Sequence, residues 1–156
     1  MTQPITKLPC LSVQDPWATA LVTLDQDIDK DVENRNWHNS PGLLAQARRL
    51  VGQRVAIHAS KTYDVSGYHH IRQLTGKRIP KETCSLGHVI GVITLADVRD
   101  WSSSRWYAEG QIALLRRNPI PLDRPIEQRG ALGFFLLDEQ KTDMIRRQLA
   151  FQGVTL

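Results

Sequence analysis

Lys30-Asp31-Val32-Glu33-Asn34-Arg35-Asn36-Trp37 is the first of two stretches that decide the fold of this chain. Successive side chains of an extended segment point to opposite faces. An extended conformation would therefore place Glu33, Arg35 and Trp37 on one face, and Val32 and Asn34 on the other. An acid, a guanidinium and an indole would stand side by side, which is an unusual face for a purely structural strand.

Ala56-Ile57-His58-Ala59-Ser60-Lys61 is the second stretch. The same alternation puts Val55 and Ile57 on one face of a strand and His58 and Ser60 on the opposite face. Each of the two strands would then carry one apolar face and one face of titratable or hydrogen-bonding groups. We expect the two polar faces to floor a single polar cleft, and this cleft to be the working part of the protein.

Length and composition describe one ordinary globular domain, residues 1–156. A chain of this size buries roughly two thirds of its unfolded surface without disulfides or metal. The hydrophobic fraction is 41% and the charged fraction 23%, and no apolar run approaches the roughly 20 residues that cross a bilayer. We therefore expect no integral membrane role.

Cys10 and Cys84 lack motif spacing and no apolar leader precedes them, which predicts a reducing, cytoplasmic setting. We expect both cysteines to be small buried hydrophobes.

The net charge of +4 and a sequence pI near 9.3 favour polyanionic partners. Three groups of cationic side chains could bind successive phosphates of a nucleic-acid backbone. Simple exposure to solvent on the protein surface accounts for their positions in the sequence equally well. They are Arg48, Arg49 and Arg54; Lys77, Arg78 and Lys81; and Arg116 with Arg117.

Periodicity predicts short strands alternating with short helices. Residues 11–13 form a strand that ends where Asp15 caps a helix, with Pro16 in its first position and an apolar stripe from Trp17 to Leu24. Further strands are expected at 54–59, 89–95, 112–115 and 132–137, and further helices at 43–51, 64–75 and 138–151. The proline-rich run 118–125 should be an extended connection or an edge. The fold class is α+β, built on a small, curled, mostly antiparallel sheet.

Five pieces of the chain, in order, resemble the ASCH domain family. They are residues 12–18 (SVQDPWA), 30–37 (KDVENRNW), 57–61 (IHASK), 87–91 (GHVIG), and 119–121 (PIP) with 130–135 (GALGFF). The resemblance covers nearly the whole chain and implies a PUA-like β-barrel flanked by helices, with a cleft between barrel and helices. Members of this family bind RNA or other nucleic acid, and a few are small enzymes that act on nucleic acid or acetylated cytidine.

The chain departs from the family pattern at two positions. The family usually has Gly-x-Lys before its Glu-Asn-Arg element, whereas here Asp27-Ile28-Asp29-Lys30 keeps the lysine without the glycine. In the acetylcytidine-hydrolysing relatives a threonine lies three residues after that lysine and acts as nucleophile, and the matching residue here is Glu33. A carboxylate replaces an activated hydroxyl poorly in amide hydrolysis, so we expect no deacetylation of acetylcytidine.

The leading hypothesis is a domain that binds RNA or single-stranded nucleic acid through a basic cleft beside the barrel. The alternative is a small hydrolase, either a ribonuclease or a modified-nucleoside amidohydrolase, with Lys30 and His58 as acid–base groups. A third class is an adaptor for a protein partner that the sequence does not identify. No cofactor and no metal are expected. The candidate nucleic-acid-binding residues are Gln14, Trp17, Lys30, Glu33, Asn34, Arg35, Trp37, His58, Ser60 and Lys61.

Each candidate also has a structural interpretation. Lys30 is either a cleft residue that pairs with phosphate or moves protons, or a solvated loop lysine among Asp25, Asp27, Asp29 and Asp31. Those aspartates resemble a calcium loop, but Lys30 replaces its glycine and Asn36 its glutamate, so a solvated acidic loop is expected instead.

The remaining candidates divide in the same way. Glu33 and Arg35 form either a structural ion pair or ligand contacts. Core packing is favoured over base stacking for Trp17. For Trp37 and His58 both roles stay open.

Overall fold

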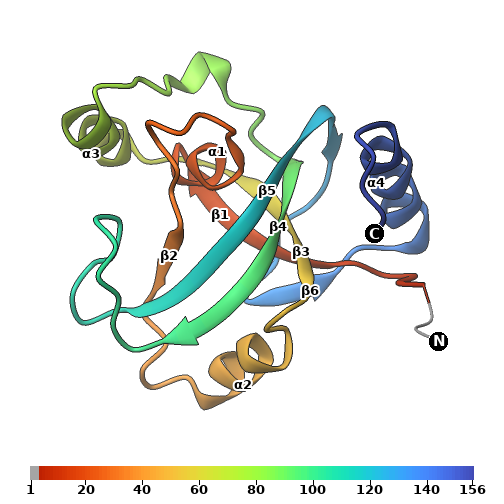
Figure 1. Cartoon of the computed structure of the whole chain (residues 1–156), viewed down its shortest axis with the longest axis horizontal. Helices are drawn as coiled ribbons and strands as arrows, with labels where there is room; N and C mark the ends of the chain where they lie inside the picture. Colours follow the sequence, from red (N-terminus) through yellow and green to blue (C-terminus); the bar gives the residue numbers. More distant parts are fainter. Residues whose placement is uncertain (1–3) are drawn as a thin grey trace.

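The structure is a computed structural model that describes residues 4–156. Its elements, in chain order, are β1 (Pro9–Asp15), α1 (Trp17–Val22), β2 (Val32–Arg35), α2 (Pro41–Arg49), β3 (Arg54–Tyr63), α3 (Val65–Thr75), the 3-10 turn η1 (Lys81–Thr83), β4 (His88–Arg99), β5 (Ile112–Glu127), β6 (Phe134–Leu136) and α4 (Glu139–Phe151) (Figure 1). The α+β class expected from the sequence is confirmed.

One six-stranded sheet carries the fold, in the order β2-β5-β4-β3-β1-β6. β1 and β3 run parallel, and every other pair is antiparallel. The two edge strands, β2 and β6, do not pair with each other, so the sheet is open rather than a closed barrel. It nevertheless curls, because side chains from all six strands line one shared interior: Leu11, Glu33, Ile57, Ile93, Leu114 and Phe134.

β5 is longer than the sequence predicted. The run 118–125 is not a connection, because it continues the strand that begins at Ile112 and pairs with β4 as far as the His88–Glu127 register. On its other side β5 pairs with β2 only over residues 112–115. Beyond Leu115 no second strand pairs with this side of β5 among residues 4–156. Prolines are therefore tolerated there, as expected for an edge.

The first helix is shorter than predicted and begins one residue later. Its N-cap is Pro16, yet the Oδ1 atom of Asp15 still accepts hydrogen bonds from the backbone N and the Oγ1 of Thr19, both at 2.8 Å. The helix ends at Val22, and Leu24 is 62% exposed, so the apolar stripe does not extend to it. A Cβ atom at Gly91 would lie 2.7 Å from Val22 Cβ. The close approach of α1 to β4 therefore depends on a glycine at this position.

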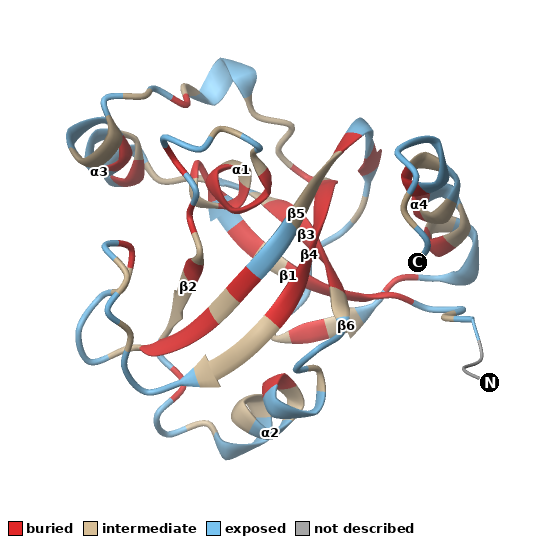
Figure 2. Cartoon of the chain, in the orientation of Figure 1, coloured by how far each residue is buried: buried red, intermediate tan, exposed pale blue. Residues whose placement is uncertain are grey.

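Apolar side chains pack on both faces of the curled sheet. Figure 2 shows the buried residues along the strands and on the helices that cover them. The inner face packs against α1 and α2, and the outer face against α4, which contributes Ile145 and Leu149. A third cluster joins Val32 and Ile28 to Ile71 of α3 and to Trp106. α3 and α4 begin close to the expected positions, capped by Asp64 and Asp138, which accept from Ser66 N and Lys141 N.

Neither cysteine is in a disulfide. Cys10 is fully buried, as expected, and burial raises the pKa of its thiol. Cys84 is only half-buried, and burial is the main cause that raises its pKa to about 11.

Among residues 4–156 there is no helix with the length and apolar character that crossing a bilayer requires.

Candidate functional site

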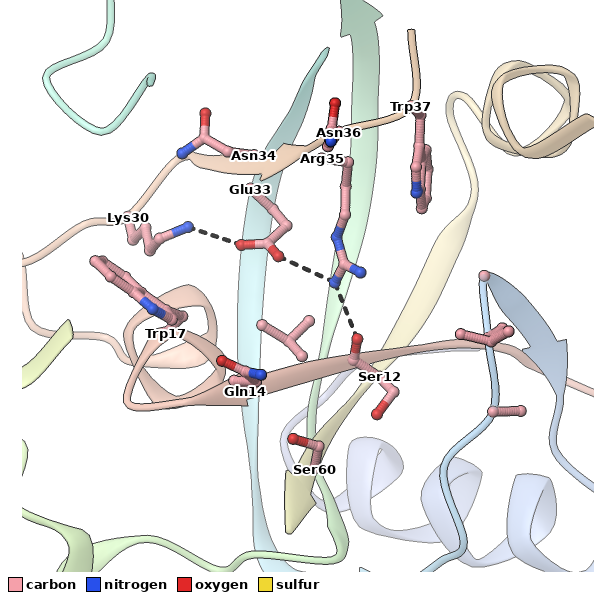
Figure 3. Close-up of a pocket in the computed structure, with 14 residues that line it drawn as sticks. Ser12, Gln14, Trp17, Lys30, Glu33, Asn34, Arg35, Asn36, Trp37 and Ser60 are labelled. Carbon is pink, nitrogen blue, oxygen red and sulfur yellow. Dashed lines mark hydrogen bonds and ion pairs between the residues drawn. The ribbon is translucent and has the colours of Figure 1, made fainter. Parts of the chain in front are cut away.

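A cleft of about 620 Å³ opens between β1, β2 and the start of α1, and we call it the β1–β2 cleft (Figure 3). It brings together eight of the ten candidate residues: Gln14, Trp17, Lys30, Glu33, Asn34, Arg35, Trp37 and Ser60. Its walls also include residues that the sequence did not single out as site residues: Ser12, Val13, Asn36, Ala131, Leu132 and Gly133. All six lie inside the motifs that carry the family resemblance, and that resemblance was the signal that could have found them.

The alternation expected in β2 is confirmed. Glu33 and Arg35 line the β1–β2 cleft, whereas Val32 is buried on the opposite side against α3. The side chain of Asn34 binds the loop after β4: its Nδ2 donates to Trp106 O and its Oδ1 accepts from Ala108 N, both at 2.9 Å. Asn34 therefore anchors a loop and contributes to the cleft only at its rim.

Lys30, Glu33 and Arg35 form one charged network in this cleft (Figure 3). Lys30 Nζ lies 3.0 Å from Glu33 Oε1 and also donates to Val32 O. Arg35 Nη2 lies 3.0 Å from Glu33 Oε2. The side chain of Lys30 is 2% exposed, so the solvated-loop interpretation of Lys30 is wrong. The short segment before β2 folds the lysine inward because Glu33 and a carbonyl together satisfy its ammonium group.

Burial and charge act on this network in opposite directions. Burial lowers the pKa of Lys30 below its ordinary value, although Glu33 opposes the change. Burial alone would raise the pKa of Glu33, but Lys30 and Arg35 outweigh it and the pKa is lowered. Glu33 is therefore a carboxylate at neutral pH, and Lys30 gives up its proton more readily than a solvated lysine.

The two tryptophans have different positions in the cleft. Trp17 is half-buried: it packs against the core, as expected, and it also lines the cleft. Its Nε1 donates to Asp64 Oδ2 at 2.9 Å, and its indole lies against the backbone of Gly67 in α3. Trp37 is 7% exposed and packs edge-on to Phe134, with the Arg35 guanidinium 5.6 Å from its ring centroid. Little of the Trp37 ring is left open for stacking.

His58 and Lys61 line a different cleft, of about 870 Å³, between the end of β3, the end of β5, residues 128–130 and α4; we call it the α4 cleft. The expectation that His58 shares a cleft with Glu33 and Arg35 is wrong. Glu33 faces the interior of the curled sheet together with Ile57, and alternation turns His58 to the outer face. Ser60, near the end of β3, lines both clefts.

Hydrogen bonds occupy both ring nitrogens of His58. Nε2 lies 2.7 Å from the carbonyl oxygen of Gln128, which can only accept, so Nε2 carries the proton. In the neutral ring Nδ1 then accepts from the Ser12 hydroxyl at 2.9 Å. Burial lowers the pKa of His58, and the residue is 2% exposed. The geometry does not bring His58 to Lys30 as a second acid–base group.

Cations hold the acidic loop in place, so it is not merely solvated. Lys77 Nζ lies 3.3 Å from carboxylate oxygens of both Asp25 and Asp27. Asp29 pairs with the buried Arg116 at 3.1 Å. Lys77 and Arg116, two of the cations considered for phosphate contacts, are therefore already paired. Within the described chain, no three His, Cys, Asp or Glu side chains are arranged to hold a metal ion.

No protein-family model matches this chain, and no curated protein matches it in sequence. Solved structures of the ASCH protein from Zymomonas mobilis do match it. A mutant of that protein has a TM-score of 0.50 at 17% identity, over 92% of this chain and 97% of the other. A structure of ASCH from the same organism has a TM-score of 0.49 at 17% identity, over 90% and 94%. The first of these likenesses shows that this chain has the fold of the ASCH protein.

Proposed function

We propose that this ASCH-fold protein binds single-stranded RNA and holds an unstacked base in the β1–β2 cleft. The observation that carries the proposal is the position of Arg35. Its Nη2 is engaged by Glu33 and by Ser12 O, while its Nη1 makes no hydrogen bond within residues 4–156. A guanidinium held in place with a free donor suits the acceptor atoms of a base edge or a phosphate.

Further polar groups around Arg35 are available to a ligand. Gln14 and Asn36 are exposed, line the cleft, and their side-chain amides have no hydrogen-bond partner in the described part of the chain. An amide presents both donors and an acceptor, which is what the Watson–Crick edge of a splayed base requires. The cleft volume of about 620 Å³ lies within the range of small-ligand sites.

Trp17 is the better stacking surface of the two tryptophans. It is half-buried, and its indole is held by Asp64 and by contact with Gly67. A ring that is already fixed loses little freedom when a base stacks on it. Stacking on such a ring contributes about 1–3 kcal/mol per base.

Binding of fluorescein-labelled single-stranded RNA, followed by anisotropy over a series of salt concentrations, tests the proposal. We expect binding at low salt and a linear fall of log affinity with log salt, by about 0.7 for each phosphate contacted. A duplex of the same sequence should bind more weakly, because its bases are not free to enter the cleft. Absence of binding at low salt, or an affinity that does not respond to salt, would contradict the proposal.

A second candidate function, a small hydrolase acting on RNA or a modified nucleoside, is favoured by the state of Lys30. A buried lysine with a lowered pKa, 3.0 Å from a carboxylate, is an arrangement that general acid–base catalysis uses. The test is incubation of the protein with labelled RNA and with acetylcytidine, with chromatography of the products. Turnover that Lys30→Met abolishes would support the hydrolase, and unchanged substrates would exclude it for these compounds.

A further inference from the structure

Three cations converge on the α4 cleft: Lys61 from β3, Arg129 from the loop after β5, and Lys141 from α4. Among residues 4–156 no carboxylate lies within ion-pair distance of any of them, and Lys141 Nζ donates to Gln128 Oε1 at 2.7 Å. Glu127 is the acidic residue in the lining, so the cleft carries three positive charges against one negative. The lining of the β1–β2 cleft carries two positive charges, on Lys30 and Arg35, against one negative charge on Glu33. The α4 cleft is therefore the more basic of the two.

A single loop separates the clefts. Gln128, Arg129 and Gly130 line the α4 cleft, and the residues that follow, 131–133, line the β1–β2 cleft. Leu132 in this loop is 97% exposed. Ser60 lines both clefts, so the two adjoin at this residue, near the end of β3.

The floor beneath the loop is ordered by hydrogen bonds. Arg35 Nη2, in the first cleft, donates to Ser12 O, and the Ser12 hydroxyl donates to His58 in the floor of the second. His58 Nε2 donates to Gln128 O, and Gln128 N donates to Gly87 O. A Cβ at Gly130 would lie 3.0 Å from both His58 Cε1 and Ser12 Oγ, so the loop rests directly on this floor. The spacing between the clefts is therefore fixed before any ligand binds.

We infer that the α4 cleft is a second subsite for the same RNA strand, which binds the sugar-phosphate of a nucleotide next to the base held in the β1–β2 cleft. This inference rests on the proposed function. Lys61 and Arg129 supply unpaired positive charge for a phosphate. The Ser60 hydroxyl lies where the RNA strand would pass from one cleft to the other. Exposed Leu132 offers an apolar contact to the sugar or base of the nucleotide that crosses the loop. Occupancy of both clefts requires a strand that bends around the loop, which a single strand does and an A-form duplex does not.

The test compares two double variants of equal charge. Lys61→Gln/Arg129→Gln removes two exposed cations of the α4 cleft and keeps the Lys141–Gln128 hydrogen bond. Arg48→Gln/Arg78→Gln removes two exposed cations that line neither cleft. Both variants and the unsubstituted protein are titrated, by anisotropy, with labelled single-stranded RNA of about eight nucleotides, a length within the usual range of sites for small single-strand-binding folds.

We expect Lys61→Gln/Arg129→Gln to reduce the slope of log affinity against log salt by about 0.7 for each phosphate that the protein no longer neutralises, and the control variant to leave the slope unchanged. A labelled nucleoside, which carries a base for the β1–β2 cleft but no phosphate for the α4 cleft, should bind both variants equally. If the unsubstituted protein binds the RNA but the two variants have the same slope, the second subsite is excluded while the proposed function stands. If the unsubstituted protein does not bind RNA at all, the proposed function itself fails and the subsite with it.

Discussion

Arg35 and Ser12 are joined by a hydrogen bond of 2.9 Å, from the guanidinium Nη2 to the carbonyl oxygen, between two strands that are not neighbours in the sheet. β2 is one edge of the sheet, and three strands separate it from β1. The contact spans the side on which the sheet is open, where ladder hydrogen bonds between the edge strands are absent. A side chain therefore holds β2 and β1 together across the mouth of the β1–β2 cleft.

Replacement of Arg35 should reveal this bridging role. We expect Arg35→Ala to lower the free energy of unfolding by about 1.5–3 kcal/mol, because it removes hydrogen bonds to a charged group while Glu33 keeps Lys30 as a partner. Urea unfolding measures the change. Arg48→Ala, at an exposed position of α2, is the control and should stay within about 0.5 kcal/mol of the unsubstituted protein. Equal effects of the two substitutions would show that Arg35 does not bridge the strands.

Glu33→Gln should cost more stability than Lys30→Met. The first leaves a buried ammonium group without its carboxylate and should cost about 3–5 kcal/mol, whereas the second leaves Glu33 paired with Arg35. The pKa of Lys30 is already lowered in the folded protein. Between this lowered pKa and the ordinary lysine value, the unfolded chain binds more protons than the folded one, so the free energy of unfolding rises with pH in that window.

Part of the cost of Glu33→Gln should therefore be recovered at alkaline pH. Urea unfolding of both single variants and the double variant, at neutral and alkaline pH, completes the comparison. A cost for Glu33→Gln that stays constant as pH rises would contradict a buried, charged Lys30.

Acidification should destabilise the protein through His58. Burial lowers its pKa below 6.5, and the Gln128 carbonyl only partly offsets this, while His88 and Lys141 add to it. Between the pKa of His58 in the folded protein and about 6.5, the unfolded chain binds more protons than the folded one. The free energy of unfolding therefore falls as pH drops through this window, and the full contribution of neutral His58 is present only above it.

NMR titration of the His58 ring should give a midpoint below 6.5. In His58→Gln the dependence of stability on pH across that window should be flatter than in the unsubstituted protein. A midpoint at or above the ordinary histidine value would contradict burial as the dominant influence on the pKa of His58.

Two glycine substitutions in helices should have opposite effects. At Gly67 of α3 a Cβ would lie 2.8 Å from Trp17 Cε2, so Gly67→Ala should displace the indole and weaken both folding and RNA binding. At Gly42 of α2 nothing lies within 4 Å, so Gly42→Ala should stabilise by about 0.4–1 kcal/mol. Thermal unfolding and tryptophan fluorescence of the two variants measure the contrast. A stabilising Gly67→Ala with unaltered fluorescence would show that Trp17 is not held as described.

Local features of the site could be predicted from the sequence because they depend only on neighbours along the chain. Strand alternation placed Glu33 and Arg35 together and Val32 opposite them, and the structure confirms both. The resemblance to the ASCH family carried the expectation further, to a β-barrel flanked by helices with a cleft between them, and the structure has a curled sheet that is not closed. The burial of Lys30 was not predicted, because it depends on Glu33 turning its carboxylate toward a segment whose composition is that of a solvated acidic loop.

The sequence alone determined the approximate positions of most elements, the polar face of β2 and the α+β class, since these follow from side-chain period and backbone propensity over a few residues. It did not determine where α1 and β5 end. Only the tertiary structure decided which polar faces meet. β2 and β3 are separated in the sheet by β5 and β4, and the curl turns the Glu33 face inward and the His58 face outward. Two strands with similar sequence patterns therefore line two different clefts. The direction in which each polar face points is set by strand order and sheet curvature, which are long-range properties of the packed chain.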